Sequence, residues 1–230
     1  MNARSGFRSK WMTAVSVLFA CLTPAAGGGA PSDSPFAQLL TTWRQVRDFT
    51  VTIEATERLG GRTTQNVLHY AFRKPDRARL DVVAGPSRGA VVIWRGGDRV
   101  TAYHRSLSFF KVRTRVKSSR VTSPRGNGVL TPNLGDVLEC FARHRGDVRE
   151  RPGPMVDGDA TSAIVLNYTG GVACPDDSSK DGDVTQDVLY VSRRTGYVVR
   201  RERYERESLV ERYALRDLRV DEGLPDDLFR

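Results

Sequence analysis

The fold is decided by the stretch Asp48-Phe49-Thr50-Val51-Thr52-Ile53-Glu54-Ala55-Thr56. Apolar side chains alternate with polar ones along it, so that every second residue is apolar. Successive side chains of a β-strand point to opposite faces, so this period of two predicts a strand with one buried face and one wet face. A strand of this kind needs paired neighbours and a core to cover its apolar face.

Further strands follow on both sides of turn residues. Gly60-Gly61 predicts a tight turn, and residues 63–73 return as a second strand that ends before Pro75. The same reasoning predicts strands at 77–84, 90–95, 99–104, 108–114, 148–151, 160–168, 187–192, 197–206 and 209–219. Short strands joined by turns predict an antiparallel meander.

Two segments have helical spacing instead. Residues 34–46 begin with Ser34 as the cap and Pro35 at the first helical position, and residues 133–144 end before Gly146. Residues 118–128 are polar and contain glycine, which predicts a mobile loop, and residues 224–229 are predicted to dock as a short tail. About ten or eleven strands with two to three helices predict a mainly β protein. Its curled antiparallel sheet forms an unclosed barrel with the helices over the concave face.

The N-terminus predicts export. Three basic residues precede the apolar run 11–22, and no acidic residue occurs before Asp33, so residues 1–20 are interpreted as a signal peptide. Leu18-Phe19-Ala20-Cys21 resembles a bacterial lipobox, which would make Cys21 the lipidated first residue. The alternative is an ordinary signal cut after Ala25 or Ala26. Residues 21–33 are rich in Pro, Ala, Gly and Ser and predict a flexible tether before a domain at 34–230.

The net charge indicates which classes of partner to expect, and the cysteine content indicates whether a disulfide can form. Removing Arg4, Arg8 and Lys10 lowers the formal charge from +9 to about +6. The remaining arginines are spread along strands, which indicates solvated, ion-paired faces, and no basic helix supports a nucleic-acid partner. In an oxidising compartment Cys140 and Cys174 form either a disulfide or two unpaired thiols.

No catalytic or metal-binding pattern is found in the sequence. His69, His104 and His144 lie on separate elements, and Glu54 and Glu57 face opposite sides of one strand. The acidic loop 176–183 resembles the start of a calcium loop, but its twelfth position is Val188, so we interpret it as solvated. We therefore expect no enzyme activity, no cofactor and no metal.

Several segments resemble the LolA/LolB outer-membrane lipoprotein-sorting superfamily. They are Phe72-Arg73-Lys74-Pro75 with the strand that follows it, the hairpin at 92–103, the late hairpin at 188–200, and the ending at 223–229. The resemblance covers most of the chain after Asp33. It implies an unclosed barrel that binds acyl chains of lipoproteins, or other apolar ligands, on its concave side. It also places Lys74 where carriers more often have an arginine that latches the helices shut.

The ligand-binding residues implied by this resemblance are apolar. The predicted strands contribute Phe49, Val51, Ile53, Tyr70, Phe72, Leu80 and Trp94. The predicted helices contribute Leu40, Trp43, Leu138 and Phe141. The alternative is that they are simply core under the helices. We expect a lipoprotein carrier or acceptor, with lipid as its partner and a membrane anchor if Cys21 is acylated. The other interpretation is an envelope sensor or protein-interaction domain on the same scaffold.

The predicted location follows from the same residues. We expect the periplasmic side of the cell envelope, with anchoring to the outer membrane because Leu22, not aspartate, follows Cys21. The alternative is a soluble periplasmic protein.

Overall fold

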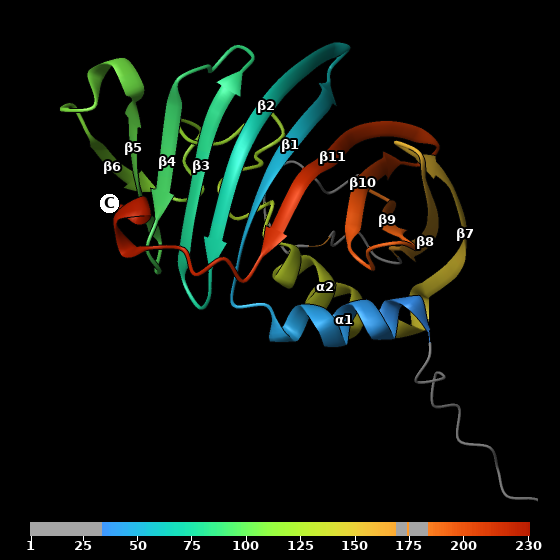
Figure 1. Cartoon of the computed structure of the whole chain (residues 1–230). Helices are drawn as coiled ribbons and strands as arrows, with labels where there is room; N and C mark the ends of the chain where they lie inside the picture. Colours follow the sequence, from blue (N-terminus) through green and yellow to red (C-terminus); the bar gives the residue numbers. More distant parts are fainter. Residues whose placement is uncertain (1–33, 169–173, 175–183) are drawn as a thin grey trace, which may run out of the picture. The chain divides into compact units, whose positions relative to one another are not determined.

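The computed structural model describes residues 34–168, 174 and 184–230 (Figure 1). Within them lie two α-helices, α1 (Pro35–Gln45) and α2 (Leu134–Arg143), and three short 3-10 helices, Arg105–Leu107, Arg145–Asp147 and Asp226–Phe229. The eleven strands of the described residues are β1 (Asp48–Leu59), β2 (Arg62–Arg73), β3 (Arg77–Ala84), β4 (Ala90–Trp94), β5 (Arg99–His104), β6 (Val112–Arg115), β7 (Val148–Val156), β8 (Asp159–Asn167), β9 (Gln186–Ser192), β10 (Val198–Glu205) and β11 (Ser208–Val220).

All of these strands belong to one antiparallel sheet. Its order is β6-β5-β4-β3-β2-β1-β11-β10-β9-β8-β7, so β6 and β7 are its two edges. The hairpin β1–β2 turns at Gly60 and Gly61, whose positive φ angles of 55° and 77° suit a tight turn with the strand twist. Pairing of β1 with β11 joins the N-terminal and C-terminal meanders. The predicted unclosed, mainly β fold is confirmed.

Both helices pack on the same side of the curled sheet (Figure 1). The Ser34 hydroxyl accepts a hydrogen bond from the Ala37 amide at 3.1 Å and starts α1, and Asn133 caps α2 in the same way. Phe36, Leu39 and Trp43 of α1 share the main core with the inward side chains of β1. None of the helices in the described part of the chain is long and apolar enough to cross a bilayer.

Two strands have bounds that differ clearly from the predicted ones. The strand predicted at 108–114 is β6, Val112–Arg115, because residues 105–110 form a 3-10 turn and a tight turn whose apolar side chains have no core to cover. The strand predicted at 148–151 continues to Val156 through Pro152 and Pro154. An edge strand tolerates both prolines, because part of its backbone faces no partner.

The prediction of a mobile loop at residues 118–128 is wrong. This segment lies on the concave side of the sheet and is fixed there by Arg125, whose side chain is 1% exposed. The predicted docking of the tail is confirmed, since Phe229 is buried against Ala71, Val91 and Ile93 on the outer face.

Candidate functional site

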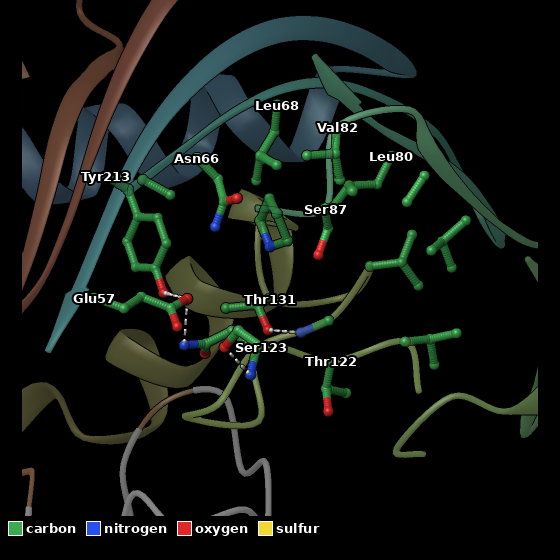
Figure 2. Close-up of a pocket in the computed structure, with 18 of the residues that line it drawn as sticks. Glu57, Asn66, Leu68, Leu80, Val82, Ser87, Thr122, Ser123, Thr131 and Tyr213 are labelled. Atoms are coloured by element: carbon green, nitrogen blue, oxygen red, sulfur yellow. Dashed lines mark hydrogen bonds between the residues drawn. The ribbon is translucent and has the colours of Figure 1, made fainter. Parts of the chain in front are cut away.

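The candidate site is a cavity of about 150 Å³ between the concave face of the sheet and the segment 120–132 (Figure 2). It lies over the ends of β1–β4 and β11 that are remote from α1. An engineered protein cavity of about this volume binds benzene. Its lining residues come from the strands and from the covering segment, and are Ala55, Glu57, Asn66, Leu68, Leu80, Val82, Ser87, Ala90, Val92, Arg120, Val121, Thr122, Ser123, Asn127, Gly128, Val129, Thr131, Pro132 and Tyr213.

The wall of this cavity has an apolar side and a polar side. Leu68, Leu80 and Val82 point into it from neighbouring strands β2 and β3, as Figure 2 shows. Glu57 lies on the opposite side with Tyr213 and the polar groups of the covering segment. The site can therefore enclose an apolar body and contact one polar group.

A row of buried charges crosses the concave face beside the cavity. Glu57 is paired in register with Glu211, Glu211 with Arg203, and Arg203 with Asp187, on strands β1, β11, β10 and β9. We call these four residues the charged row; none is more than 6% exposed. Arg203 Nη1 donates to Glu211 Oε2 at 3.0 Å, and Arg201 also pairs with Asp187. The expectation that the strand arginines are solvated is wrong for this row.

Arg125 of the covering segment binds Glu211 of the charged row. Its Nε donates to Glu211 Oε1 at 2.7 Å, its Nη2 to Glu205 Oε1 at 2.6 Å, and its Nη1 to the carbonyl oxygen of Arg58 at 2.9 Å. One side chain thus ties segment 120–132 to three strands. The sequence reasoning missed this residue, because a single arginine between Pro124 and Gly126 has no local pattern that distinguishes it.

The two carboxyl groups at this end of the sheet titrate differently. Burial raises the pKa of Glu57, the negative charge of Glu211 raises it further, and Ser123 and Asn127 offset part of this effect. For Glu211 burial acts in the same direction, but Arg203, Arg125 and Asn127 outweigh it and lower the pKa to about 2. Glu57 is therefore the more readily protonated of the two.

Most of the predicted ligand-binding residues lie elsewhere in the concave face. Leu80 lines the cavity, and Ile53 lines a second space of about 20 Å³ near Leu134. The remaining residues pack in the main core under the helices, partly as ring contacts: Phe49, Val51, Tyr70, Phe72, Trp94, Leu40, Trp43, Leu138 and Phe141. The rings of Trp43 and Phe49 are 5.1 Å apart, for example, which fills the space between α1 and β1.

Lys74 lies at the end of α1. Its Nζ donates to the carbonyl oxygens of Trp43 at 3.1 Å and Arg44 at 3.0 Å. Burial lowers the pKa of Lys74, and the nearby acids Asp221 and Glu139 partly offset this effect. The amine donates to helix carbonyls that have no partner within the helix. Its positive charge is also stabilised by the negative C-terminal end of the helix dipole. This contact ties α1 to the β2–β3 turn, and its role as a latch stays a prediction.

The cysteines of the domain are close together. Cys140 of α2 and Cys174 are joined by a disulfide, with Cα atoms 5.7 Å apart. Their sulfur atoms and a ring nitrogen of His144 lie within 4.8 Å of one another, which would suit a metal only with both thiols reduced. Cys21, with the predicted signal peptide and tether, lies outside the described residues, as does the acidic loop 176–183.

No family model matches the chain, and no curated protein sequence matches it significantly. Several solved structures, in contrast, are similar to this chain. A conserved protein from Thermus thermophilus has a TM-score of 0.50 and 9% identity, over 84% of this chain and 90% of that one. An outer membrane lipoprotein-sorting protein domain from Vibrio parahaemolyticus has a TM-score of 0.42 and 15% identity, over 85% of this chain and 94% of that one. A LolA superfamily protein from Nitrosomonas europaea has a TM-score of 0.39 and 13% identity, over 84% of this chain and 96% of that one. At these identities the similarity concerns the fold alone.

Proposed function

We propose that this chain is a non-enzymatic cell-envelope protein that binds an apolar ligand, such as the acyl chain of a lipoprotein, in the cavity under segment 120–132. The cavity is the observation that carries the proposal. One side of its wall carries the aliphatic side chains of Leu68, Leu80 and Val82, and each methylene buried there would contribute about 0.8 kcal/mol. The solved lipoprotein-sorting domain of the same fold supports the choice of ligand.

The size of the cavity sets a condition on binding. At about 150 Å³ it admits a small ligand or the end of a chain. A longer acyl chain requires segment 120–132 to move away from the sheet. Arg125 holds that segment through Glu205 and Glu211, so these ion pairs would control how far the cavity opens.

Binding can be tested with a fluorescent fatty acyl probe and a matched pair of variants. Val82 lines the cavity and Val83, the next residue of β3, does not. Val82→Phe should fill the cavity and weaken probe binding at least tenfold, whereas Val83→Phe should leave it within twofold. If the wild-type protein binds no probe and co-purifies with no lipid, the proposal is wrong and an interaction domain on this scaffold becomes the better interpretation.

Location is a separate part of the proposal. The N-terminal sequence supports export and lipidation at Cys21, which would hold the domain at the outer membrane through a tether of residues 21–33. Mass spectrometry of the mature N-terminus decides this. A diacylglyceryl mass on Cys21 supports the anchor, and a terminus beyond Ala25 shows a protein released from the membrane.

A further inference from the structure

Glu57 presents a buried oxygen atom without a hydrogen bond at the polar side of the cavity. The residue is 6% exposed. Its Oε1 accepts from Asn127 Nδ2 at 3.1 Å and from the Tyr213 hydroxyl at 3.4 Å. Its Oε2 makes no hydrogen bond to any residue that the structure describes, although the nearby Ser123 side chain lowers the pKa of the carboxyl group. A buried carboxylate oxygen in this state is costly unless another donor reaches it.

We propose that the ligand of this cavity carries a hydrogen-bond donor, a hydroxyl or an ammonium group, that reaches Glu57 Oε2 while its apolar part lies against Leu68 and Val82. The inference rests on the proposed function and names the ligand class of the same site. When its carboxyl group is ionised, Glu57 can only accept hydrogen bonds, so a ligand that reaches Oε2 then has to donate. The cavity provides the space on one side of Glu57, and Asn127 and Tyr213 fix the carboxylate from the other.

The surrounding charges work against a ligand with an anionic end. Glu211 lies beside Glu57 in the sheet register, although Arg203 and Arg125 bind its carboxylate. Among the lining residues of the described chain, Arg120 is the one cation, and it is exposed at the rim. A carboxylate ligand would therefore have to stay at the rim rather than reach Glu57.

The test compares three ligands that differ only at the polar end: hexanol, hexylamine and hexanoate. We would titrate each into the wild-type protein at pH 8 and measure affinity by calorimetry and chemical-shift changes. Hexanol and hexylamine should bind at least tenfold more tightly than hexanoate. Glu57→Gln should weaken hexylamine about tenfold and strengthen hexanoate. Glu54→Gln, on the exposed face of the same strand, should change neither.

The outcomes separate this inference from the function on which it rests. If all three ligands bind equally well, or if Glu57→Gln leaves their ranking unchanged, the cavity binds ligands but the assignment of a donor is overturned. If none of the three binds, including the uncharged hexanol, the cavity is not a ligand site and both conclusions fail. The comparison among ligands on the wild-type protein does not depend on how the variant folds.

A second, independent observation concerns the turn between β5 and β6. Leu107, Phe109 and Phe110 are 50%, 85% and 66% exposed. They follow the end of β5 that is remote from α1 and α2 (Figure 1). Exposed apolar groups gathered in one short turn are characteristic of a surface that binds a partner or a membrane.

The charges around this turn indicate the kind of partner. No acidic residue occurs between Asp98 and Asp136. The exposed cations that follow the turn are Lys111, Arg113, Arg115, Lys117 and Arg120. Apolar side chains at a tip with cations behind them complement the acyl and headgroup layers of an anionic bilayer. The geometry points to this turn, residues 107–110, as a docking site for the surface of an anionic lipid bilayer.

The turn also lies next to the cavity. The Arg105 amide donates to the carbonyl oxygen of Gly89 at 2.8 Å, and the neighbouring residue Ala90 lines the cavity. A bilayer bound at residues 107–110 would thus lie near the end of the cavity formed by the β3–β4 turn.

Vesicle sedimentation tests this docking in the full chain carrying Cys21→Ser, so that no lipid anchor contributes. The protein should sediment with vesicles of phosphatidylglycerol and phosphatidylcholine at least tenfold more than with phosphatidylcholine alone, and less at high salt. Phe109→Ser with Phe110→Ser should abolish this binding. Met155→Ser, which removes an apolar side chain 63% exposed on edge strand β7, should not. Equal sedimentation of the Phe109→Ser/Phe110→Ser variant, or none by the parent, overturns the inference.

Discussion

Glu57 and Glu211 occupy paired positions of neighbouring strands β1 and β11 and share two donors. Asn127 Nδ2 donates to Glu57 Oε1 at 3.1 Å and to Glu211 Oε1 at 3.2 Å. The Tyr213 hydroxyl lies 2.8 Å from Glu211 Oε2 and 3.4 Å from Glu57 Oε1. Two buried acids so close together cannot ionise independently, and the cations near Glu211 decide which of them keeps its charge.

Removing Arg125 should loosen the segment that covers the cavity. Arg125→Ala leaves the carboxylate of Glu211 buried with one cation fewer, which should cost about 3 kcal/mol of unfolding free energy. Urea denaturation followed by circular dichroism measures this. Arg120→Ala, an exposed arginine of the same segment, should stay within about 0.5 kcal/mol of wild type. Equal stabilities of the two variants would show that Arg125 does not fix the segment.

Stability should fall in acid because of Glu211. Its folded-state pKa of about 2 is below the ordinary 4.5, so its contribution is present above about pH 4.5 and is lost as the pH falls through about 2. The shift corresponds to about 3 kcal/mol at neutral pH. Urea midpoints between pH 2 and pH 7 should therefore rise with pH in wild type and rise less in Glu211→Gln. A parallel pH dependence in both proteins would contradict this assignment.

Glu57 should have the opposite effect. Its folded-state pKa is raised, chiefly by burial, so the folded state binds this proton more tightly than the unfolded chain. The resulting stability is present below the ordinary pKa and is lost as the pH rises through the folded value. Glu57→Gln should thus raise the urea midpoint at pH 8 and change it little at pH 4. A lower midpoint at pH 8 would mean that the ionised form is the favoured one.

The disulfide between Cys140 and Cys174 should stabilise the folded protein. It closes a loop with a sequence separation of 34, for which loop closure predicts about 3–4 kcal/mol. Replacing both cysteines by serine should lower the unfolding free energy by about this amount. A thiol titration of the unfolded wild-type domain should find Cys140 and Cys174 unreactive until a reductant is added. Free thiols at both positions would show that the bond does not form.

Lys74 should hold the end of α1 against the sheet. Lys74→Met removes both hydrogen bonds to the helix carbonyls and should cost about 1 kcal/mol. If Lys74 acts as a latch, the variant should also release a bound acyl probe faster in stopped-flow experiments. Lys74→Arg should restore slow release, whereas Arg77→Met, at a nearby surface ion pair, should leave the rate unchanged. Unchanged release in Lys74→Met would leave Lys74 as a helix anchor only.

Much of the fold is readable from the sequence because local features determine it. The alternation from Phe49 to Ala55, the glycine turn after β1 and the capped apolar stripe of α1 each depend on residues close together in the chain. The position of the cavity, in contrast, depends on residues that are far apart in the chain. Sequence reasoning placed ligand-binding residues at Phe49, Phe72 and Trp43, where aromatic rings from α1 and the sheet fill the space.

Local patterns in the sequence are enough to predict a mainly β chain with alternating strands, two capped helices and an export-like N-terminus. The place of the cavity on the concave face, and the segment that covers it, depend on contacts between residues far apart in the chain. Arg125 meets Glu211 across 86 residues, and β1 meets β11 across the length of the domain. The burial of an arginine and of neighbouring acids depends on charges that only folding brings together, so no local pattern could reveal it.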